Sequence, residues 1–211
     1  LDSNAFVAIA DIASKLPGDF FLGGPVGMDY EKDPPEWIRA YIPYHAGWEY
    51  PVFSVTEVRE ACFWGANWVA DADDLRRIGG ISLRFGPTAQ AKGEETKAQR
   101  LLLEQGVRGY YVPGIRIWHY VSARDCAQEH ILFQGYRRSF SAAIFRESNV
   151  IERSMRLVKD LLRIVLAFLR MVWYTVGRDA LSVFAMRYTI ACSWGDCMGI
   201  FKPGWRDEKC A

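Results

Sequence analysis

The chain has 211 residues, of which 50% are hydrophobic and 24% are charged, so it can bury a core and is neither disordered nor fibrous. Its 26 basic and 25 acidic residues give a formal net charge of +1, which excludes a global electrostatic attraction to nucleic acid. Five cysteines without a C-x-x-C pair argue against a disulfide framework and a zinc knuckle, and favour a reducing, cytoplasmic compartment.

Short predicted elements and turn-rich segments fill the first part of the chain. Apolar residues at near-helical spacing predict a helix over residues 5–16, and Phe20-Phe21-Leu22 predicts a short buried strand. Residues 33–51 are rich in proline and aromatic side chains and form a predicted loop, which either covers a cleft or packs on the core. Asp71 is a suitable N-cap for a short helix that ends at Gly79-Gly80.

A further helix is predicted to begin at Gly93-Glu94-Glu95 and to stop at Gly106. Acidic side chains in a first helical turn suit the positive end of the helix dipole, so capping alone accounts for the pair. A carboxylate in this place could also act as a general base. The residues themselves leave both alternatives open.

Residues 110–112 and 115–121 predict two strands joined by a Pro-Gly turn. In the second strand, Ile115, Ile117 and His119 share one face by alternation. We therefore expect His119 to end an inward-facing row. A histidine at a strand end is either a structural residue or a ligand.

Residues 154–176 predict a long amphipathic helix with a basic stripe and an otherwise apolar circumference. The stripe consists of Arg156, Lys159, Arg163, Arg170 and Arg178. Such a helix either lies on an anionic membrane surface, which we expect, or packs its apolar side against the folded domain. No stretch reaches the roughly eighteen uncharged apolar residues of a membrane span. Residues 181–190 form another apolar segment, and the remainder from Trp194 is rich in turn residues and offers no further chemistry.

The order of these pieces resembles the second half of a family 2 glycosyltransferase with the GT-A fold. The matching pieces are Gly23-Gly24-Pro25, Gly65-Ala66-Asn67, Gly79-Gly80, Gly93-Glu94-Glu95, Tyr110-Tyr111-Val112-Pro113 and His119. The resemblance covers about residues 15–145. It implies an α/β fold, with a partial GT-A-like mixed sheet and flanking helices over residues 1–148 and a helical C-terminal appendage over residues 149–211.

The resemblance also implies a mechanism, in which a carboxylate deprotonates an acceptor hydroxyl as that hydroxyl attacks the anomeric carbon of a nucleotide sugar. Glu95 matches the position of this base, with Glu94 as its neighbour and fallback, although the family's usual aspartate is a glutamate here. A divalent metal, Mg²⁺ or Mn²⁺, is implied as well. His119 matches a position that reaches the metal or the diphosphate in several branches of the family.

The residues that match substrate-binding positions of the family are Trp64, Gly65, Ala66, Asn67, Gln134, Arg137 and Arg138. The 65–67 loop lies near the donor sugar and the acceptor in such folds, where glycine permits close backbone approach. Trp64 either stacks on a sugar or packs in the core. Residues 134–138 partly match the Gln-x-x-Arg-Trp motif of processive synthases, but an arginine replaces the tryptophan, which favours transfer of a single sugar. The two arginines otherwise face solvent.

The family's first half, which holds the nucleotide site and the aspartate-rich metal motif, has no match in this sequence. Asp29-Tyr30-Glu31 falls too late in the family order and is predicted to be a loop. Because the chain also begins at Leu1 without a methionine, we expect the C-terminal half of a transferase that binds nucleotide sugar poorly by itself.

The expected function is hexosyl transfer to a saccharide or lipid-linked acceptor during the synthesis of cell-envelope polysaccharide or glycolipid. The expected location is the cytoplasm, at the inner face of the membrane. The alternative is a non-catalytic membrane-surface interaction module that retains the scaffold without the donor site.

Overall fold

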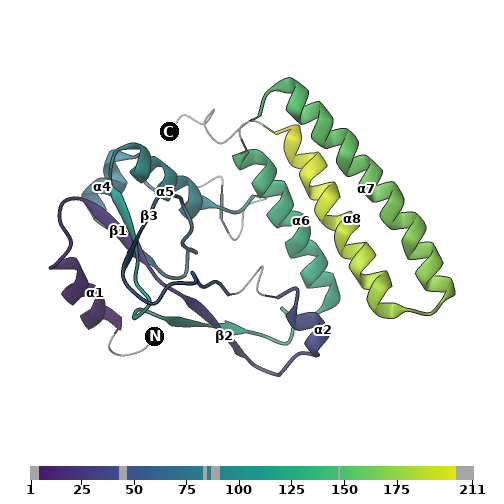
Figure 1. Cartoon of the computed structure of the whole chain (residues 1–211), viewed down its shortest axis with the longest axis horizontal. Helices are drawn as coiled ribbons and strands as arrows, with labels where there is room; N and C mark the ends of the chain where they lie inside the picture. The colour runs from purple at the N-terminus through teal and green to yellow at the C-terminus, as the bar shows by residue number, and fades with distance from the viewer. Residues whose placement is uncertain (1–4, 43–46, 83–84, 87–90, 147, 203–211) are drawn as a thin grey trace. The chain divides into compact units, whose positions relative to one another are not determined.

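The computed structural model describes residues 5–42, 47–82, 85–86, 91–146 and 148–202 (Figure 1). The chain divides into two compact units. Unit 1 comprises Leu1–Asp33, Ile42–Gly86 and Gly93–Ser122, and unit 2 comprises Pro34–Tyr41, Pro87–Lys92 and Ala123–Ala211. The predicted boundary between residues 148 and 149 therefore lies inside unit 2.

Unit 1 is built on a four-stranded mixed sheet. Strand β1 (Phe20–Gly23) pairs in parallel with β5 (Arg108–Tyr111) and antiparallel with β4 (Trp68–Ala70), and β3 (Thr56–Val58) pairs antiparallel with the other edge of β5. A separate parallel pair consists of β2 (Val26–Tyr30) and β6 (Ile117–Val121). The expected α/β architecture with a mixed sheet and flanking helices is confirmed.

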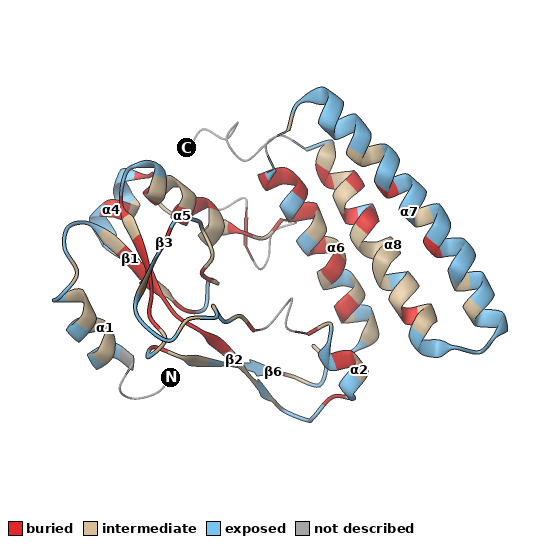
Figure 2. Ribbon diagram, viewed as in Figure 1, coloured by how far each residue is buried: buried red, intermediate tan, exposed pale blue. Residues whose placement is uncertain are grey.

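The helices of unit 1 are α1 (Ala5–Ala13), α4 (Ala72–Arg77) and α5 (Glu94–Glu104). Successive residues of a strand point to opposite faces of the sheet, so each central strand contributes to two cores. Phe21 and Tyr111 pack in a core with Leu102 of α5, whereas Leu22 packs in a second core with Ile9 of α1. In Figure 2 the buried residues of these strands, coloured red, lie between the two cores.

Unit 2 consists of α2 (Glu36–Arg39), α6 (Gln128–Phe145), α7 (Val150–Val176) and α8 (Ala180–Ile200). Helix α8 contacts both α6 and α7, and the three long helices lie side by side (Figure 1). The close approach of α8 to α6 depends on two glycines in α8. A Cβ atom on Gly195 would collide with the carbonyl oxygen of Tyr136, and one on Gly199 would lie 2.5 Å from that of Phe140. The two helix backbones can approach this closely only because both positions are glycine.

A cluster of charged side chains joins α7 to α8. Asp160 is buried and its neighbour is Asp196; Arg163 binds Asp160 at 3.0 Å, and Arg156 binds Asp196 at 2.7 Å. Burial and the adjacent Asp196 carboxyl both raise the pKa of Asp160, and Arg163 offsets only part of this rise.

Several sequence predictions differ from the structure at the ends of elements. The long helix begins at Val150 because Asn149 and Glu152 form a capping box. It ends before Arg178, which has a left-handed φ of 57°, so the prediction that Arg178 belongs to the stripe on this helix is wrong. The predicted turn-rich segment from Trp194 is wrong up to Ile200, since α8 continues through it. Asp29 and Tyr30 belong to β2 and are not in a loop.

The predicted loop at residues 33–51 contributes to packing in both units. Trp37 and Tyr41 contact Phe184 of α8, each with 5.1 Å between ring centroids, whereas Trp48 packs against Phe63 and Tyr111 in the core of unit 1. Packing is thus the correct alternative for these aromatic residues. No helix among the residues described has the length and apolar character needed to cross a membrane.

The α6–α8 contact can be tested with Gly195→Ala. Because the added methyl group meets the Tyr136 carbonyl group, we expect a loss of about 1–3 kcal/mol in the free energy of unfolding, measured by urea denaturation with circular dichroism. Gly177→Ala is the matched control, since Gly177 has φ of −75° and no atom closer than 3.7 Å to an added Cβ. Equal stability of the two variants would contradict this account of the contact.

The Asp160 cluster predicts a pH dependence of a defined sign. A carboxyl group with a raised pKa in the folded state destabilises the fold as pH rises from about 3.9 through its folded value. The stability of Asp160→Asn relative to wild type should therefore increase as the pH is raised from about 4.

Asp179 is the matched control because hydrogen bonds from Ser182 lower the pKa of this helix-capping carboxyl group. Its contribution to stability is lost as pH falls, so the relative stability of Asp179→Asn should change with pH in the opposite direction. Denaturation curves at a series of pH values measure both trends. The same slope for both variants would refute the assignment.

Candidate functional site

One face of α5 is fixed against the segment that precedes β4. Glu95, Gln99 and Leu102 share this face because they are separated by four and three residues. Gln99 is completely buried; its Oε1 accepts a hydrogen bond from the Phe63 amide at 3.0 Å, and its Nε2 donates one to the Phe63 carbonyl at 2.8 Å. These two bonds set the position of the backbone at residue 63.

The following residues bring Gly65 beside Glu95, one helical turn before Gln99. A Cβ atom on Gly65 would lie 3.7 Å from Glu95 Oε2, at ordinary contact distance. Gly65 and Ala66 are exposed, whereas Glu95 is half-buried. The carboxylate of Glu95 therefore lies next to an exposed backbone segment, Gly65-Ala66, that has almost no side chains.

Glu94 has a different environment from Glu95. Its Oε2 accepts a hydrogen bond from the amide of Gly93 at 3.2 Å, and a Cβ atom on Gly86 would lie 3.6 Å from its carboxylate. Gly93 itself occupies the N-cap position with φ of 108°, a conformation that favours glycine. The capping interpretation thus fits Glu94, and the base interpretation fits Glu95 better.

Asn67 holds the loop to the start of the β2–β6 pair. Its buried Nδ2 donates hydrogen bonds to the carbonyl groups of Pro25 at 3.0 Å and of Ile115 at 2.8 Å. Both amide hydrogens are used in this way, so Asn67 positions the loop. Trp64 is half-buried at the start of the same turn, where its carbonyl group accepts a hydrogen bond from the Asn67 amide.

His119 lies on β6, next to Met28 of β2 in the parallel register. The prediction that it ends an inward-facing row is wrong, because the row is buried at Ile115, half-buried at Ile117 and exposed at His119. Among the residues described, no group of three or more His, Cys, Asp or Glu side chains is placed to hold a metal ion.

The second set of predicted substrate residues belongs to α6 in unit 2. The Gln134 side chain contacts His130, with 3.0 Å between the two Nε2 atoms. Arg137 is buried and its guanidinium group lies 5.8 Å from the ring centre of Phe133, whereas Arg138 is exposed. Arg138 is thus accessible to solvent, and the solvent-facing alternative is wrong for Arg137.

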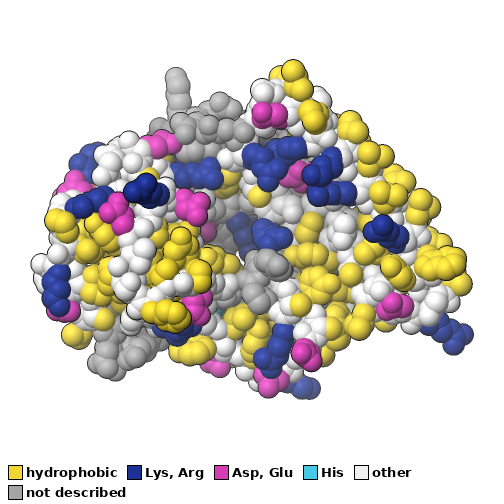
Figure 3. Space-filling view, in the orientation of Figure 1, with side chains coloured by type: hydrophobic (Ala, Val, Ile, Leu, Met, Phe, Trp, Pro, Cys, Tyr) yellow, Lys and Arg dark blue, Asp and Glu magenta, His cyan; other side chains and the backbone are white. Residues whose placement is uncertain are grey.

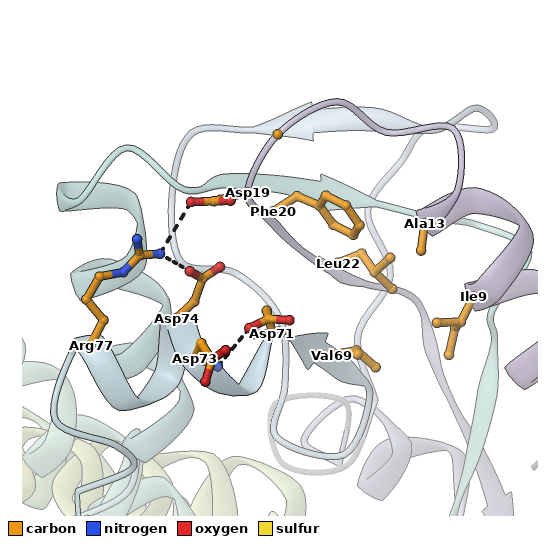
Figure 4. A pocket seen from close by; sticks show the side chains of 12 residues that line it. Ile9, Ala13, Asp19, Phe20, Leu22, Val69, Asp71, Asp73, Asp74 and Arg77 are labelled. Carbon is orange, nitrogen blue, oxygen red and sulfur yellow. Dashed lines mark hydrogen bonds and ion pairs between the residues drawn. The ribbon is translucent and has the colours of Figure 1, made fainter.

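A hollow of about 680 Å³ lies elsewhere in unit 1, between α1 and α4 (Figure 4). Its acidic side chains already have partners within the fold: Arg77 binds Asp19 and Asp74, and Asp71 caps α4 through the amide of Asp73. Neither Glu95 nor the 64–67 loop lines it. The carboxylates in this hollow are explained by these contacts within the fold.

Cys62, which directly precedes the buried Phe63, is a poor nucleophile. Burial, with a smaller contribution from Glu60, raises the pKa of its thiol to about 12, so the reactive thiolate is scarce at neutral pH. The half-buried carboxylate of Glu95 is thus the better candidate for chemistry next to the 64–67 loop.

Comparison with protein-family models, curated proteins and solved structures yields no match to this chain.

Gln99 is the residue of this site that the sequence analysis missed. The available signal was its spacing, four residues after Glu95 on the face of the predicted helix that also carries Leu102. A glutamine on a helix is ordinarily predicted to face solvent. The burial of Gln99 becomes evident only from the structure, which places the backbone of Phe63 against its side chain.

The Gln99 contact predicts a large effect of Gln99→Met, which keeps the side-chain size and removes both hydrogen bonds. Leaving the buried amide and carbonyl groups of Phe63 unsatisfied should lower the free energy of unfolding by about 2–4 kcal/mol, measured by chemical denaturation. Gln105→Met at the exposed end of α5 is the control and should change stability little. A tolerated Gln99→Met would show that these bonds do not hold the loop.

Proposed function

We propose that unit 1 is the acceptor-binding part of a sugar transferase with a GT-A-like fold, in which Glu95 is the general base. The observation that carries this proposal is that the Glu95 carboxylate lies beside Gly65, where a Cβ atom added to the glycine would be 3.7 Å from Oε2. In the family 2 glycosyltransferases that the sequence resembles, the corresponding acidic motif and Gly-Ala-Asn loop serve one reaction.

The sheet order supports the same proposal. Parallel pairing of β1 with β5 brings two distant predicted strands together, and Asn67 ties the loop to the residues that follow each of them, Pro25 and Ile115. The 64–67 loop and the first turn of α5 thus meet beside the carboxyl ends of two parallel strands, an edge where α/β proteins commonly bind ligands.

The proposed reaction is the transfer of a hexosyl group from a nucleotide sugar to a saccharide or lipid-linked acceptor. The acceptor hydroxyl oxygen forms a bond to the anomeric carbon, the bond from that carbon to the diphosphate breaks, and the diphosphate leaves with the bonding electrons. Glu95 takes the hydroxyl proton, a role that typically contributes about 10²- to 10⁴-fold in rate. Glutamate reaches one methylene further than the family's aspartate, which matches a carboxylate that extends from α5 to the neighbouring loop.

The divalent metal implied by the resemblance does not have a complete site in the residues described. His119 supplies one imidazole on an exposed strand, and hard cations such as Mg²⁺ require several oxygen ligands. The cell-envelope role, the donor and the acceptor remain parts of the proposal that rest on the resemblance alone.

The proposal predicts that Glu95→Gln in the full-length gene product lowers the rate of sugar transfer by about 10²- to 10⁴-fold. Gln keeps the size of the side chain and cannot accept the hydroxyl proton. The assay measures release of nucleoside diphosphate and glycosylated product from a panel of nucleotide sugars and saccharide acceptors.

Two further variants make this test specific. Glu104→Gln, at the exposed C-terminal end of α5, controls for the loss of one negative charge and should retain full activity. A greater loss in Glu94→Gln than in Glu95→Gln would move the base to Glu94. A full-length protein without transfer activity on any donor would favour the non-catalytic interaction module.

A further inference from the structure

Helix α7 exposes apolar side chains along its whole length. It runs for 27 residues, about 40 Å, and the side directed away from α8 carries exposed leucine, valine and tryptophan. The central members of this apolar face are Val158, Leu161, Leu162, Val165, Leu169 and Trp173, each between 45% and 76% exposed. In Figure 2 the helix is exposed over most of its surface, and in Figure 3 hydrophobic side chains follow its outer edge.

An apolar face of this extent requires a partner, because monomeric soluble proteins rarely leave a contiguous patch larger than a few hundred Å² in water. Asp160 and Ala167 mark the opposite, buried side of α7 that packs within unit 2. The exposed face is therefore additional to the face used for folding.

The charges on α7 favour one kind of partner. Lys159, Arg163 and Arg170 form one exposed edge of the apolar face at helical spacing. Arg163 forms an ion pair with Asp160, whereas neither Lys159 nor Arg170 forms an ion pair with another residue that the structure describes. Both acidic residues of α7 have roles in the fold, since Glu152 completes the capping box and Asp160 is buried. The apolar face thus has a basic edge and no exposed acidic side chain beyond the first turn.

We propose that this face of α7 docks in the plane of an anionic lipid bilayer. The apolar side chains enter the boundary between headgroups and acyl chains, and the long Lys159 and Arg170 side chains reach the phosphate level at its edge. Anionic headgroups complement the basic edge, whereas a second copy of the chain would bring the same basic edge. This inference is independent of the sugar-transfer proposal, because it rests on α7 alone.

Flotation with lipid vesicles tests the docking without donor or acceptor. The chain should float with vesicles of phosphatidylcholine that contain a minority of phosphatidylserine, and on the order of tenfold less with phosphatidylcholine alone. Val165→Glu with Leu169→Glu places two carboxylates in the centre of the face and should weaken binding at least about tenfold. Lys159→Ala with Arg170→Ala should weaken binding to the anionic vesicles by about fivefold per residue.

A matched control adds the same charge at another exposed apolar site. Phe53→Glu with Val55→Glu alters side chains that are 99% and 45% exposed in unit 1, and should leave flotation unchanged. Circular dichroism of each variant verifies that its helical content equals that of the wild type.

The inference would be overturned if the chain floats with neither type of vesicle. It would also be overturned if the variant with two glutamates in α7 floats as well as the wild type. A third contrary result is a dimer, seen by analytical ultracentrifugation without lipid, that the two α7 glutamates dissociate. This result would make a second copy of the chain the partner of this face.

Discussion

The Gln99 side chain binds both the amide and the carbonyl group of Phe63, and the position of the candidate site follows from these two bonds. A buried amide that lost them would leave polar groups without partners, so the distance between α5 and the 63–67 segment is narrowly set. Glu95 lies one turn earlier on the same helix face and therefore meets Gly65. Asn67 fixes the other end of the segment to Pro25 and Ile115. The 63–67 segment is thus held at both ends beside the Glu95 carboxylate.

Unit 2 combines close backbone packing with charges inside a helical layer. Gly195 and Gly199 allow α8 to approach α6, and Asp160, Asp196 and two arginines join it to α7. Burial of these charges is tolerated because each carboxylate has a guanidinium partner. The buried Asp160 and Ala167 lie on the inner side of α7, whereas its outer side exposes mostly apolar residues and has one basic edge. The exposed side of this helix is thus unusually apolar for a helix at the surface.

Local signals made part of this structure predictable. The Asp71 cap, the Gly93 turn and the apolar run at Phe20 each act within a few residues, and the corresponding elements are present. Strands β3 and β4 have three residues each and exist through pairing with distant strands, so their own sequences carry little signal. Helix α6 was not predicted because its buried side includes Arg137 and Ser141, and these polar residues interrupt the periodic spacing of apolar residues that indicates a helix. His119 lies in the two-stranded β2–β6 sheet and is exposed, and alternation along one strand shows which residues share a face but not whether that face is covered.

The acceptor surface that we propose consists of Glu95 and the 64–67 loop. Its most direct test is a crystal structure of the full-length gene product with a nucleoside diphosphate and an acceptor saccharide. The account predicts an acceptor hydroxyl within about 3 Å of the Glu95 carboxylate, with the sugar against the backbone of Gly65 and Ala66. An acceptor bound at another surface, with Glu95 contacting only protein groups, would contradict it.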